Sequence, residues 1–432
     1  MRAPEWIRCP RRVLIALGVI VLLAGGLRIA SAASPDLANP STDEIAYASI
    51  ARGLTHGRYQ ESLHWPPGAP AMFAVAQKLF PDRELRAAFW AQALVGTLLV
   101  GVVFLLGRLA WGPLVGLGAA ALVAVYPPYV TLAGQLLSEP LGTLLLAAGV
   151  AALLAAWRVR RWWAYVASGV LLGGTLLTRT DLLLVPGILA VATVVTLRSQ
   201  GARAALTGPA ALLAATLVTI LPWTVFASHR AGHFVPITEG SGSALFVGTY
   251  LPGDGTTTGV KRALAGEVRA KLPRYAHTEP GLIPALNVLD VVAARRPQLA
   301  RDAALNAEAR ANLRRYAWGD PLGFGAMMAH KASRMWLVSS RAGVATKSSV
   351  TRTVHFVIVL ALALALLASC LLLRPAAQVT LLAVLAYGTV LHAVFVSKPR
   401  YALPLLPLLA VGGLAAVAAL ISRRTERTRP SG

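Results

Sequence analysis

Charged residues are scarce in this sequence. Only 14% of its 432 residues are charged, whereas 56% are hydrophobic. A soluble globular protein carries roughly 25% charged residues, so this composition argues against a soluble domain. Several runs consist almost entirely of Ala, Leu, Val and Gly. Such a run of about 20 residues crosses the hydrocarbon core of a bilayer as one helix.

Cysteine is also nearly missing, and so are the motifs of several common sites. The two cysteines are Cys9, beside an N-terminal basic cluster, and Cys370, inside an apolar run. They cannot plausibly pair across a bilayer, so we expect no disulfide. The chain has no CxxC motif, His-rich tract, P-loop or nucleotide-binding fingerprint. A cytoplasmic enzyme acting on nucleotide sugars would need such groups inside the cell.

The apolar runs do not alternate in polarity, which excludes the strands of a membrane barrel. We therefore predict an all-α fold, a polytopic bundle of about ten transmembrane helices. Residues 13–30 also fit a cleavable signal peptide, but a retained first helix agrees better with the rest of the topology. The predicted spans are 13–30, 87–107, 113–130, 138–157, 162–178, 181–197, 204–227, 354–373, 376–396 and 401–421.

The positions of the arginines indicate which end of each helix faces the cytoplasm. The formal net charge is +23, which in a soluble protein would suggest a nucleic-acid partner. Here the short connections on one side hold basic residues such as Arg108, Arg158 and Arg374, and short basic connections stay in the cytoplasm. We therefore expect no nucleic acid, both termini in the cytoplasm of a bacterial inner membrane, and long extracytoplasmic loops.

Three regions follow from this topology. Residues 1–227 form an N-terminal transmembrane module whose first outer loop spans 31–86. Residues 228–353 form an extracytoplasmic loop or cap, and residues 354–432 form the C-terminal transmembrane helices with a basic cytoplasmic tail. The chain has 18 acidic residues, and all but Glu5 and Glu426 fall in outer segments or at outer helix ends. The carboxylates therefore indicate a site on the outer face.

The first outer loop carries the densest group of reactive side chains. Ser41 or Thr42 can cap a short helix, with Asp43 and Glu44 in its first turn, where the helix dipole favours anions. Capping alone is one explanation of this acidic pair. The other is catalytic, because Tyr47, Arg52, Tyr59 and His64 follow closely and complete an acid–base and phosphate-binding set. A second short helix over 70–80 would lie beside the first on the membrane surface.

These motifs support a family resemblance. The sequence TDEIAYASIARGL, followed by WPPGAP, resembles the first periplasmic loop of GT-C glycosyltransferases, and more narrowly of bacterial relatives of protein O-mannosyltransferases and of the lipid A aminoarabinose transferase. Further matches, in order, are YPPYVTLAGQLLSEPL, GVLLGGTLLTRTDLLLVPG, LPWTVFASHRAGHFVPITEGSGSALFVGT, GDPLGFGAMMAHKASRMW and KPRYALPLLP. The resemblance implies a membrane enzyme that takes a sugar from a polyprenyl-phosphate carrier and passes it to an acceptor hydroxyl on a glycan, lipid or protein.

The chain departs from this pattern at several positions. The aminoarabinose branch has an arginine where this chain has Ala46, and a Glu-Lys pair where this chain has His64 and Trp65. The exit motif of the family often shows Arg-Asn where this chain has Phe226 and Ala227. The contacts to the carrier phosphate must then come from other residues or be weaker, which argues against aminoarabinose transfer.

The needs of such a transfer suggest a role for each candidate residue. Our hypothesis makes Asp43 the base that deprotonates the acceptor, and Glu44 the residue that orients the sugar or acceptor. Attack opposite the leaving phosphate inverts the anomeric centre with a single base. The phosphate leaving group needs cationic help, from arginines or from a divalent metal, for which the histidines show no standard spacing. Further substrate and carrier-phosphate contacts are expected from Tyr47, Arg52, His64, Glu139, Arg179, Lys398, Arg400 and Tyr401.

Several of these residues also have a purely structural explanation. Lys398 and Arg400 can be helix-end anchors in the membrane interface. Arg179 can form a local ion pair with Asp181, and Glu139 can be an acid at a helix N-terminus. Transporters or flippases of lipid-linked sugars, and glycan polymerases, are the competing functional classes. A transporter would need charged or broken sites at the membrane midplane, and the predicted spans contain few charges there.

Overall fold

The computed structural model describes residues 10–35, 37–38, 40–59, 63–338, 340–341, 344–345, 349–373 and 375–427. Glu5, Cys9 and Arg374 lie outside these ranges. Cys370 is buried and has a free thiol. The chain divides into two compact units. Unit 1 comprises residues 1–238, 339–386 and 402–432, and unit 2 comprises residues 239–338 and 387–401.

Unit 1 is a bundle of long helices. Its helices are α1 (Arg11–Ala33), α2 (Thr42–Thr55), α3 (Gly68–Leu79), α4 (Glu84–Ala110), α5 (Pro113–Val125), α6 (Pro127–Thr131), α7 (Glu139–Val159), α8 (Trp162–Leu176), α9 (Val185–Leu197), α10 (Ala202–Ala231), α17 (Ser349–Leu372), the first part of α18 (Ala376–Val394), and α19 (Leu406–Arg427). A two-residue strand pair, β1 (Ser340–Arg341) and β2 (Val344–Ala345), is antiparallel. The prediction of an all-helical fold is confirmed.

The helices have the length and composition of membrane spans. Within the part of the chain that the structure describes, seven helices are long and apolar enough to cross a bilayer, and an eighth is added if the bent pair α5–α6 counts as one span. Helices α8 and α19 coincide with the two remaining predicted spans, although the apolar part of each is shorter. The protein is therefore a multi-pass membrane protein.

The third predicted span is broken, which the sequence analysis did not anticipate. It was expected as one helix over 113–130, but the chain bends by 58° between α5 and α6. Pro127 and Pro128 follow Tyr126, and a proline disfavours helical geometry in the residue before it. The carbonyls left open at the end of α5 are bonded by the guanidinium of Arg28, which donates to Val123 and Ala124 at 3.0 Å each.

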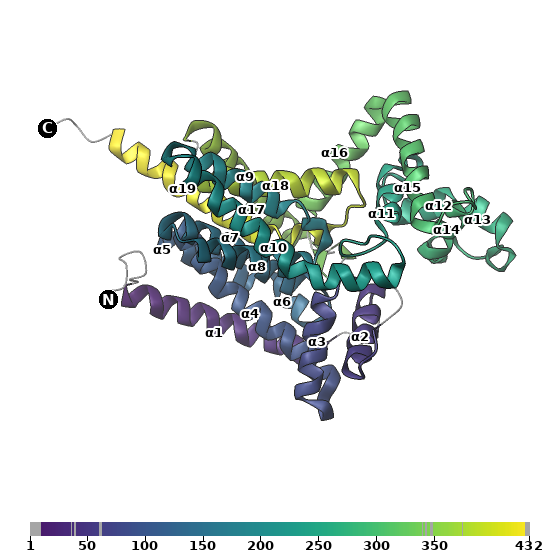
Figure 1. Cartoon of the computed structure of the whole chain (residues 1–432), viewed down its shortest axis with the longest axis horizontal. Helices are drawn as coiled ribbons and strands as arrows, with labels where there is room; N and C mark the ends of the chain where they lie inside the picture. Colours follow the sequence, from purple (N-terminus) through teal and green to yellow (C-terminus); the bar gives the residue numbers. More distant parts are fainter. Residues whose placement is uncertain are drawn as a thin grey trace. The chain divides into compact units, whose positions relative to one another are not determined.

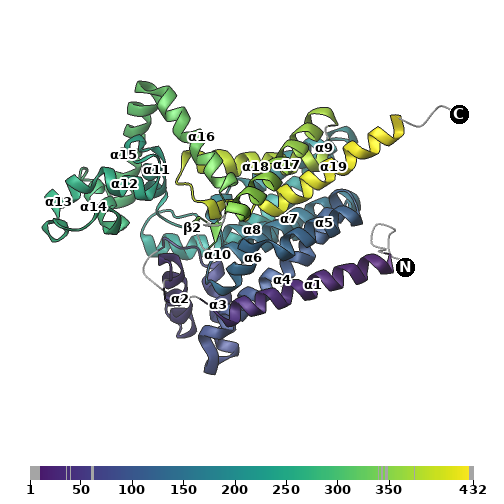
Figure 2. The same ribbon diagram turned by 180° about the vertical axis from the view of Figure 1, so that it is seen from behind.

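Both ends of unit 1 are visible in two opposite views. The start of α1 and the end of α19 lie at one end of the bundle, and α2 and α3 lie at the other (Figures 1 and 2). We call this second end the loop end. An even number of spans is required to bring the first and last helix ends to the same side.

Helices α2 and α3 are held at the loop end by an apolar cluster. Tyr47 and Ala51 from α2 and Phe73 from α3 pack with Phe89 of α4 and with Leu136. The two short helices therefore each pack one apolar face against the bundle.

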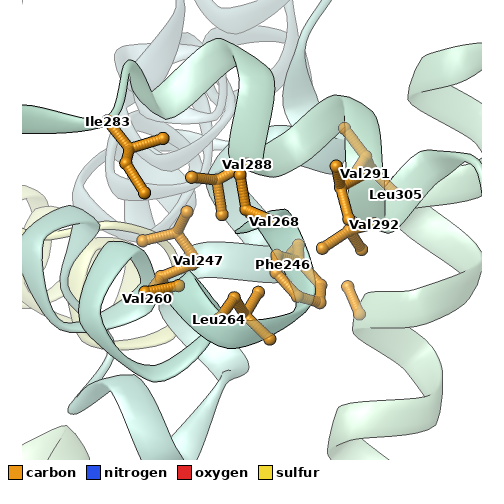
Figure 3. Close-up of a cluster of buried hydrophobic side chains, with 12 residues drawn as sticks. Phe246, Val247, Val260, Leu264, Val268, Ile283, Val288, Val291, Val292 and Leu305 are labelled. Atoms are coloured by element: carbon orange, nitrogen blue, oxygen red, sulfur yellow. The ribbon is translucent and has the colours of Figure 1, made fainter. Parts of the chain in front are cut away.

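Unit 2 has a hydrophobic core of its own. Its helices are α11 (Ser241–Thr249), α12 (Thr257–Ala263), α13 (Ala265–Lys271), α14 (Ala285–Ala293), α15 (Arg301–Asn312), α16 (Pro321–Leu337) and the last part of α18. Buried side chains from α11 to α15, including Phe246, Val268, Val292 and Leu305, meet in one cluster (Figure 3). The sequence stretches 260–275 and 285–317 both form helices, each divided into shorter pieces.

A close backbone contact ties α3 to the turn after α8. The amide of Gly68 donates to the carbonyl of Leu177 at 2.7 Å. A Cβ atom on Gly68 would lie 2.4 Å from Oγ1 of Thr178 and 2.9 Å from the Leu177 oxygen, far inside normal contact. Only glycine therefore fits at this position without a shift of one of the two segments.

We predict that Gly68→Ala destabilises the protein by ~1–3 kcal/mol, the usual cost of overpacking a dense interior. Thermal unfolding of the purified protein in detergent measures this. Gly101→Ala is the matched control, because a Cβ atom there meets nothing within 4 Å. Equal melting temperatures for the two variants would show that the α3 contact is not rigid.

Candidate active site

Helix α2 begins with the capping arrangement that the sequence predicted. The Ser41 side chain accepts a hydrogen bond from the Glu44 amide at 3.3 Å, and the Glu44 carboxylate accepts from the Ser41 amide at 2.9 Å. This reciprocal capping box fixes the start of the helix. Helix capping, the first of the two explanations for the acidic pair, therefore accounts for Glu44.

Asp43 and Glu44 lie on different faces of α2. Neighbouring residues on an α-helix point about 100° apart because each turn takes 3.6 residues. Asp43 shares its face with Tyr47, Ile50 and Ala51, of which the last three are buried against the bundle. Arg52 points in the direction opposite to Asp43 and is exposed, and Glu44 points between these two directions. The predicted set of first-loop residues therefore divides into two groups.

The Asp43 face holds two ordered polar side chains. Nε1 of Trp65 donates to Oδ1 of Asp43 at 3.3 Å. Tyr47 is 5% exposed, and its hydroxyl is hydrogen-bonded to the Ser138 side chain. Burial raises the pKa of Tyr47, and the carboxylates of Glu139 and Asp43 raise it further. The phenol thus stays protonated and can donate a hydrogen bond at neutral pH.

A buried ion-pair group adjoins Tyr47. Arg179 contacts Oε1 of Glu139 through Nη1 at 3.2 Å, and it binds both oxygens of Asp181 at 3.1 and 2.7 Å. The side chains of Arg179 and Glu139 are only 6% and 3% exposed. The local Arg179–Asp181 pair that the sequence analysis left open is therefore formed, and Glu139 extends it.

The backbone around this group leaves room for the guanidinium. A Cβ atom at position 142 would come within 2.8 Å of the Arg179 side chain, so Gly142 lets Arg179 pass α7. Gln92 of α4 donates to the carbonyls of Gln135 and Leu137 at 2.7 and 2.8 Å. These contacts fix the segment that leads into Ser138 and Glu139.

Carboxylates gather on this face. Glu139 and Asp181 share the Arg179 guanidinium, and the Asp43 carboxylate also acts on Tyr47. Carboxylates accept hydrogen bonds from hydroxyl groups, so this face suits a sugar or an acceptor. Among the described residues, no group of three or more His, Cys, Asp or Glu side chains is arranged to hold a metal ion.

The remaining predicted residues lie elsewhere. His64 is exposed and contacts the Trp65 ring edge-on, with centroids 4.9 Å apart. Lys398, Arg400 and Tyr401 belong to unit 2. There the Arg400 guanidinium lies 5.8 Å and the Lys398 ammonium 6.0 Å from the centre of the Tyr401 ring, which stacks on His392. These residues form one cationic and aromatic cluster.

Lys331 anchors the segment that carries this cluster, and sequence reasoning missed it. It is fully buried in α16, and its ammonium donates to the carbonyls of Gly248 at 2.7 Å and Val394 at 3.4 Å. Ser397 donates to the Lys331 carbonyl at 3.1 Å, and Arg334 donates to the Ser397 carbonyl, also at 3.1 Å. Nothing in the polar pattern of AHKASRMW distinguishes this lysine from a solvated one.

Arg28 is the other buried cation that the sequence analysis overlooked. It is fully buried in α1 and serves the break between α5 and α6. Here a signal was available, because an ionisable residue within a membrane span is costly and is retained for a specific partner.

Comparison with known proteins agrees with this architecture. Residues 64–226 match the sequence model of the family described as dolichyl-phosphate-mannose-protein mannosyltransferase. Comparison with curated protein sequences gives no significant match. The archaeal oligosaccharyltransferase AglB from Archaeoglobus fulgidus, in complex with an inhibitory peptide and a dolichol-phosphate, superimposes with a TM-score of 0.59 at 16% identity. The superposition covers 98% of this chain and 52% of AglB.

The fold is GT-C-like. The resemblance to GT-C membrane glycosyltransferases predicted from the motifs is thereby confirmed. The apo form of the Archaeoglobus fulgidus enzyme gives a similar TM-score of 0.57, at 15% identity over 95% of this chain and 51% of that enzyme. ArnT from Cupriavidus metallidurans, bound to undecaprenyl phosphate, matches with a TM-score of 0.43 at 20% identity over 96% of this chain and 81% of ArnT. This chain spans about half the length of AglB.

We predict that Arg179→Met costs ~3–5 kcal/mol, because it leaves Glu139 buried without its cation. The double variant Arg179→Met/Glu139→Gln should recover part of this loss, since it also removes the stranded charge. Thermal unfolding in detergent compares the two, with Arg230→Met, at an exposed site in the last turn of α10, as the control. Equal losses in the single and double variants would refute the pairing.

Lys331 should make the stability of its surroundings depend on pH. Burial, with a contribution from nearby Arg334, lowers the pKa of Lys331 from 10.5 to about 7. Between these values the unfolded segment binds more protons than the folded one, so stability rises with pH. Hydrogen exchange of residues 394–401, corrected for intrinsic rates, should show growing protection from about pH 7 to about pH 10.

The Lys331→Met variant should remove this rise in protection. Lys271→Met, in an exposed ion pair with Glu267 of the same unit, should retain it. If protection in Lys331→Met rises with pH as steeply as in the wild type, another titrating group is responsible.

Proposed function

We propose that this protein is an integral membrane glycosyltransferase that moves a sugar from a polyprenyl-phosphate donor to an acceptor hydroxyl on the extracytoplasmic face. The observation that carries the proposal is the position of Asp43. Its carboxylate accepts a hydrogen bond from Trp65 and lies on the same face of α2 as Tyr47. The Tyr47 hydroxyl is hydrogen-bonded to Ser138, beside the charges of Glu139 and Arg179. The family match over residues 64–226 and the GT-C-like fold support the same class of reaction.

The orientation in the membrane is part of this proposal. The loop end carries α2 and α3, and the short connections at the other end hold arginines such as Arg108 and Arg158. Short basic connections remain in the cytoplasm, so the loop end faces outward and both termini face the cytoplasm of a bacterial inner membrane. A lipid-linked donor suits this side, where nucleotide sugars are not supplied.

The reaction needs one base and a stabilised leaving group. Asp43 accepts the proton of the acceptor hydroxyl, and that oxygen attacks the anomeric carbon. The bond from this carbon to the phosphate oxygen breaks on the opposite side, so the configuration inverts and polyprenyl phosphate leaves. Tyr47 stays protonated and can donate to a sugar hydroxyl.

Residues other than Arg179 supply the positive charge that stabilises the leaving phosphate. That guanidinium is already bound by Glu139 and Asp181, so it orders the carboxylates rather than binding a phosphate. We assign the carrier phosphate to Lys398 and Arg400, the cationic part of the cluster around Tyr401. Guanidinium groups bind phosphate oxygens in pairs, which suits this role.

We predict that Asp43→Asn lowers kcat by ~10²–10⁴, the usual contribution of general base catalysis. The assay follows transfer of a labelled sugar from a polyprenyl-phosphate donor by the purified protein. Asp82→Asn, an exposed aspartate near the start of α4, is the matched control and should keep wild-type activity. Unchanged transfer by folded, inserted Asp43→Asn protein would eliminate the base assignment.

A further inference from the structure

A cavity of about 600 Å³ lies on the face of α2 that points away from Asp43. Ile45, Ala48, Ser49 and Arg52 of α2 line it. These positions recur at helical spacing, and their common direction is opposite to that of Asp43 and Tyr47. The cavity therefore borders the side of α2 that points away from Asp43, and it adjoins the candidate catalytic face at Phe89 and Leu136, which pack in one cluster with Tyr47.

The floor of the cavity is apolar and belongs to the membrane bundle. Leu85 and Phe89 come from the first turns of α4, a helix long and apolar enough to span the bilayer. Leu37, which follows α1, and Leu136 complete this surface. A cavity floored by the ends of membrane helices lies where the hydrocarbon meets the headgroups.

The rim of the cavity is cationic. Arg52 and Arg58 are exposed and line the cavity, and exposed His56 lies between them. Glu44 is the one carboxylate in the lining, and it is already hydrogen-bonded to Ser41 by two contacts of 2.9 Å. Guanidinium groups above an apolar floor favour an amphiphile with a phosphate group at the start of its headgroup.

We infer that this cavity binds the second substrate of the transfer, an acceptor lipid that carries a phosphate group. The inference rests on the proposed function. The carboxylates of the Asp43 face suit hydroxyl groups, whereas Arg52 and Arg58 in the cavity lining suit a phosphate. Arg52 lies nine residues after Asp43, which is about 13 Å farther along the axis of α2, so a headgroup bound at Arg52 and Arg58 must extend along and around this helix to reach Asp43. The acceptor hydroxyl is then on the sugar or polyol beyond the phosphate.

Direct binding tests the cavity without any transfer reaction. The probes are short-chain fluorescent phosphatidic acid and the diacylglycerol with the same chains, titrated into the full-length protein in neutral detergent. We expect saturable binding of phosphatidic acid at least about tenfold tighter than of diacylglycerol, a difference that corresponds to ~1.4 kcal/mol.

Matched variants locate the site. Arg52→Gln/Arg58→Gln should weaken phosphatidic acid about tenfold, in line with the loss of two cationic contacts, and should leave diacylglycerol unchanged. Arg83→Gln/Arg86→Gln removes two exposed arginines outside the cavity, near the start of α4, and should change neither. Ala48→Trp fills the cavity and should weaken both lipids. Equal effects of the two double variants, or equal affinity for the two lipids, would overturn the inference.

Two further arms separate this inference from the proposed function and from the donor. Asp43→Asn should bind phosphatidic acid as the wild type does, so a failure of catalysis leaves the binding result intact. In a transfer assay, phosphatidic acid should compete with the acceptor and not with the polyprenyl-phosphate donor. Competition with the donor alone would reassign the cavity to the carrier and overturn the acceptor role.

Discussion

The buried ion pair of Arg179 with Glu139 and Asp181 is the interaction on which the loop end of unit 1 depends. It joins the start of α7 to the turn after α8, and Ser138 extends the contact to Tyr47 on α2. A stranded charge in such a place would cost several kcal/mol, so the three side chains hold one arrangement. Because Gly68 and Gln92 tie the flanking segments to the same region, Asp43 is presented on a rigid support.

This constraint also explains how opposite charges are divided around α2. One face carries Asp43 beside Tyr47, which adjoins the carboxylate of Glu139, and the other carries Arg52 above an apolar cavity. A transferase for two amphipathic substrates has to bind hydroxyl groups and phosphates close together without binding either in the wrong place. A single short helix with different chemistry on its two faces achieves this separation. In unit 2, Lys331 supports the cationic segment in a comparable way, through backbone carbonyls.

The sequence predicted much of the fold because apolar runs, basic turns and a capping motif act locally. The spans, the helix at Thr42 and the resemblance to GT-C enzymes all follow from such local signals. The break before α6 was missed even though Pro127 and Pro128 mark it, because the run around them is uniformly apolar. The partners of Arg28, Lys331 and Glu139 are set by contacts between distant segments, which no local pattern reveals. The separation of Asp43 from Glu44 was available from helical spacing, but an acidic pair suggests a shared role when read as a motif.

The fate of a lipid-linked sugar tests the central claim most directly. Purified protein in sealed vesicles would be given polyprenyl-phosphate donors labelled in the sugar, together with candidate acceptors on the side that exposes the loop end. The account predicts that free polyprenyl phosphate and glycosylated acceptor appear in equal amounts, with the anomeric configuration inverted. Movement of intact donor across the bilayer without release of polyprenyl phosphate would show a transporter instead and contradict it.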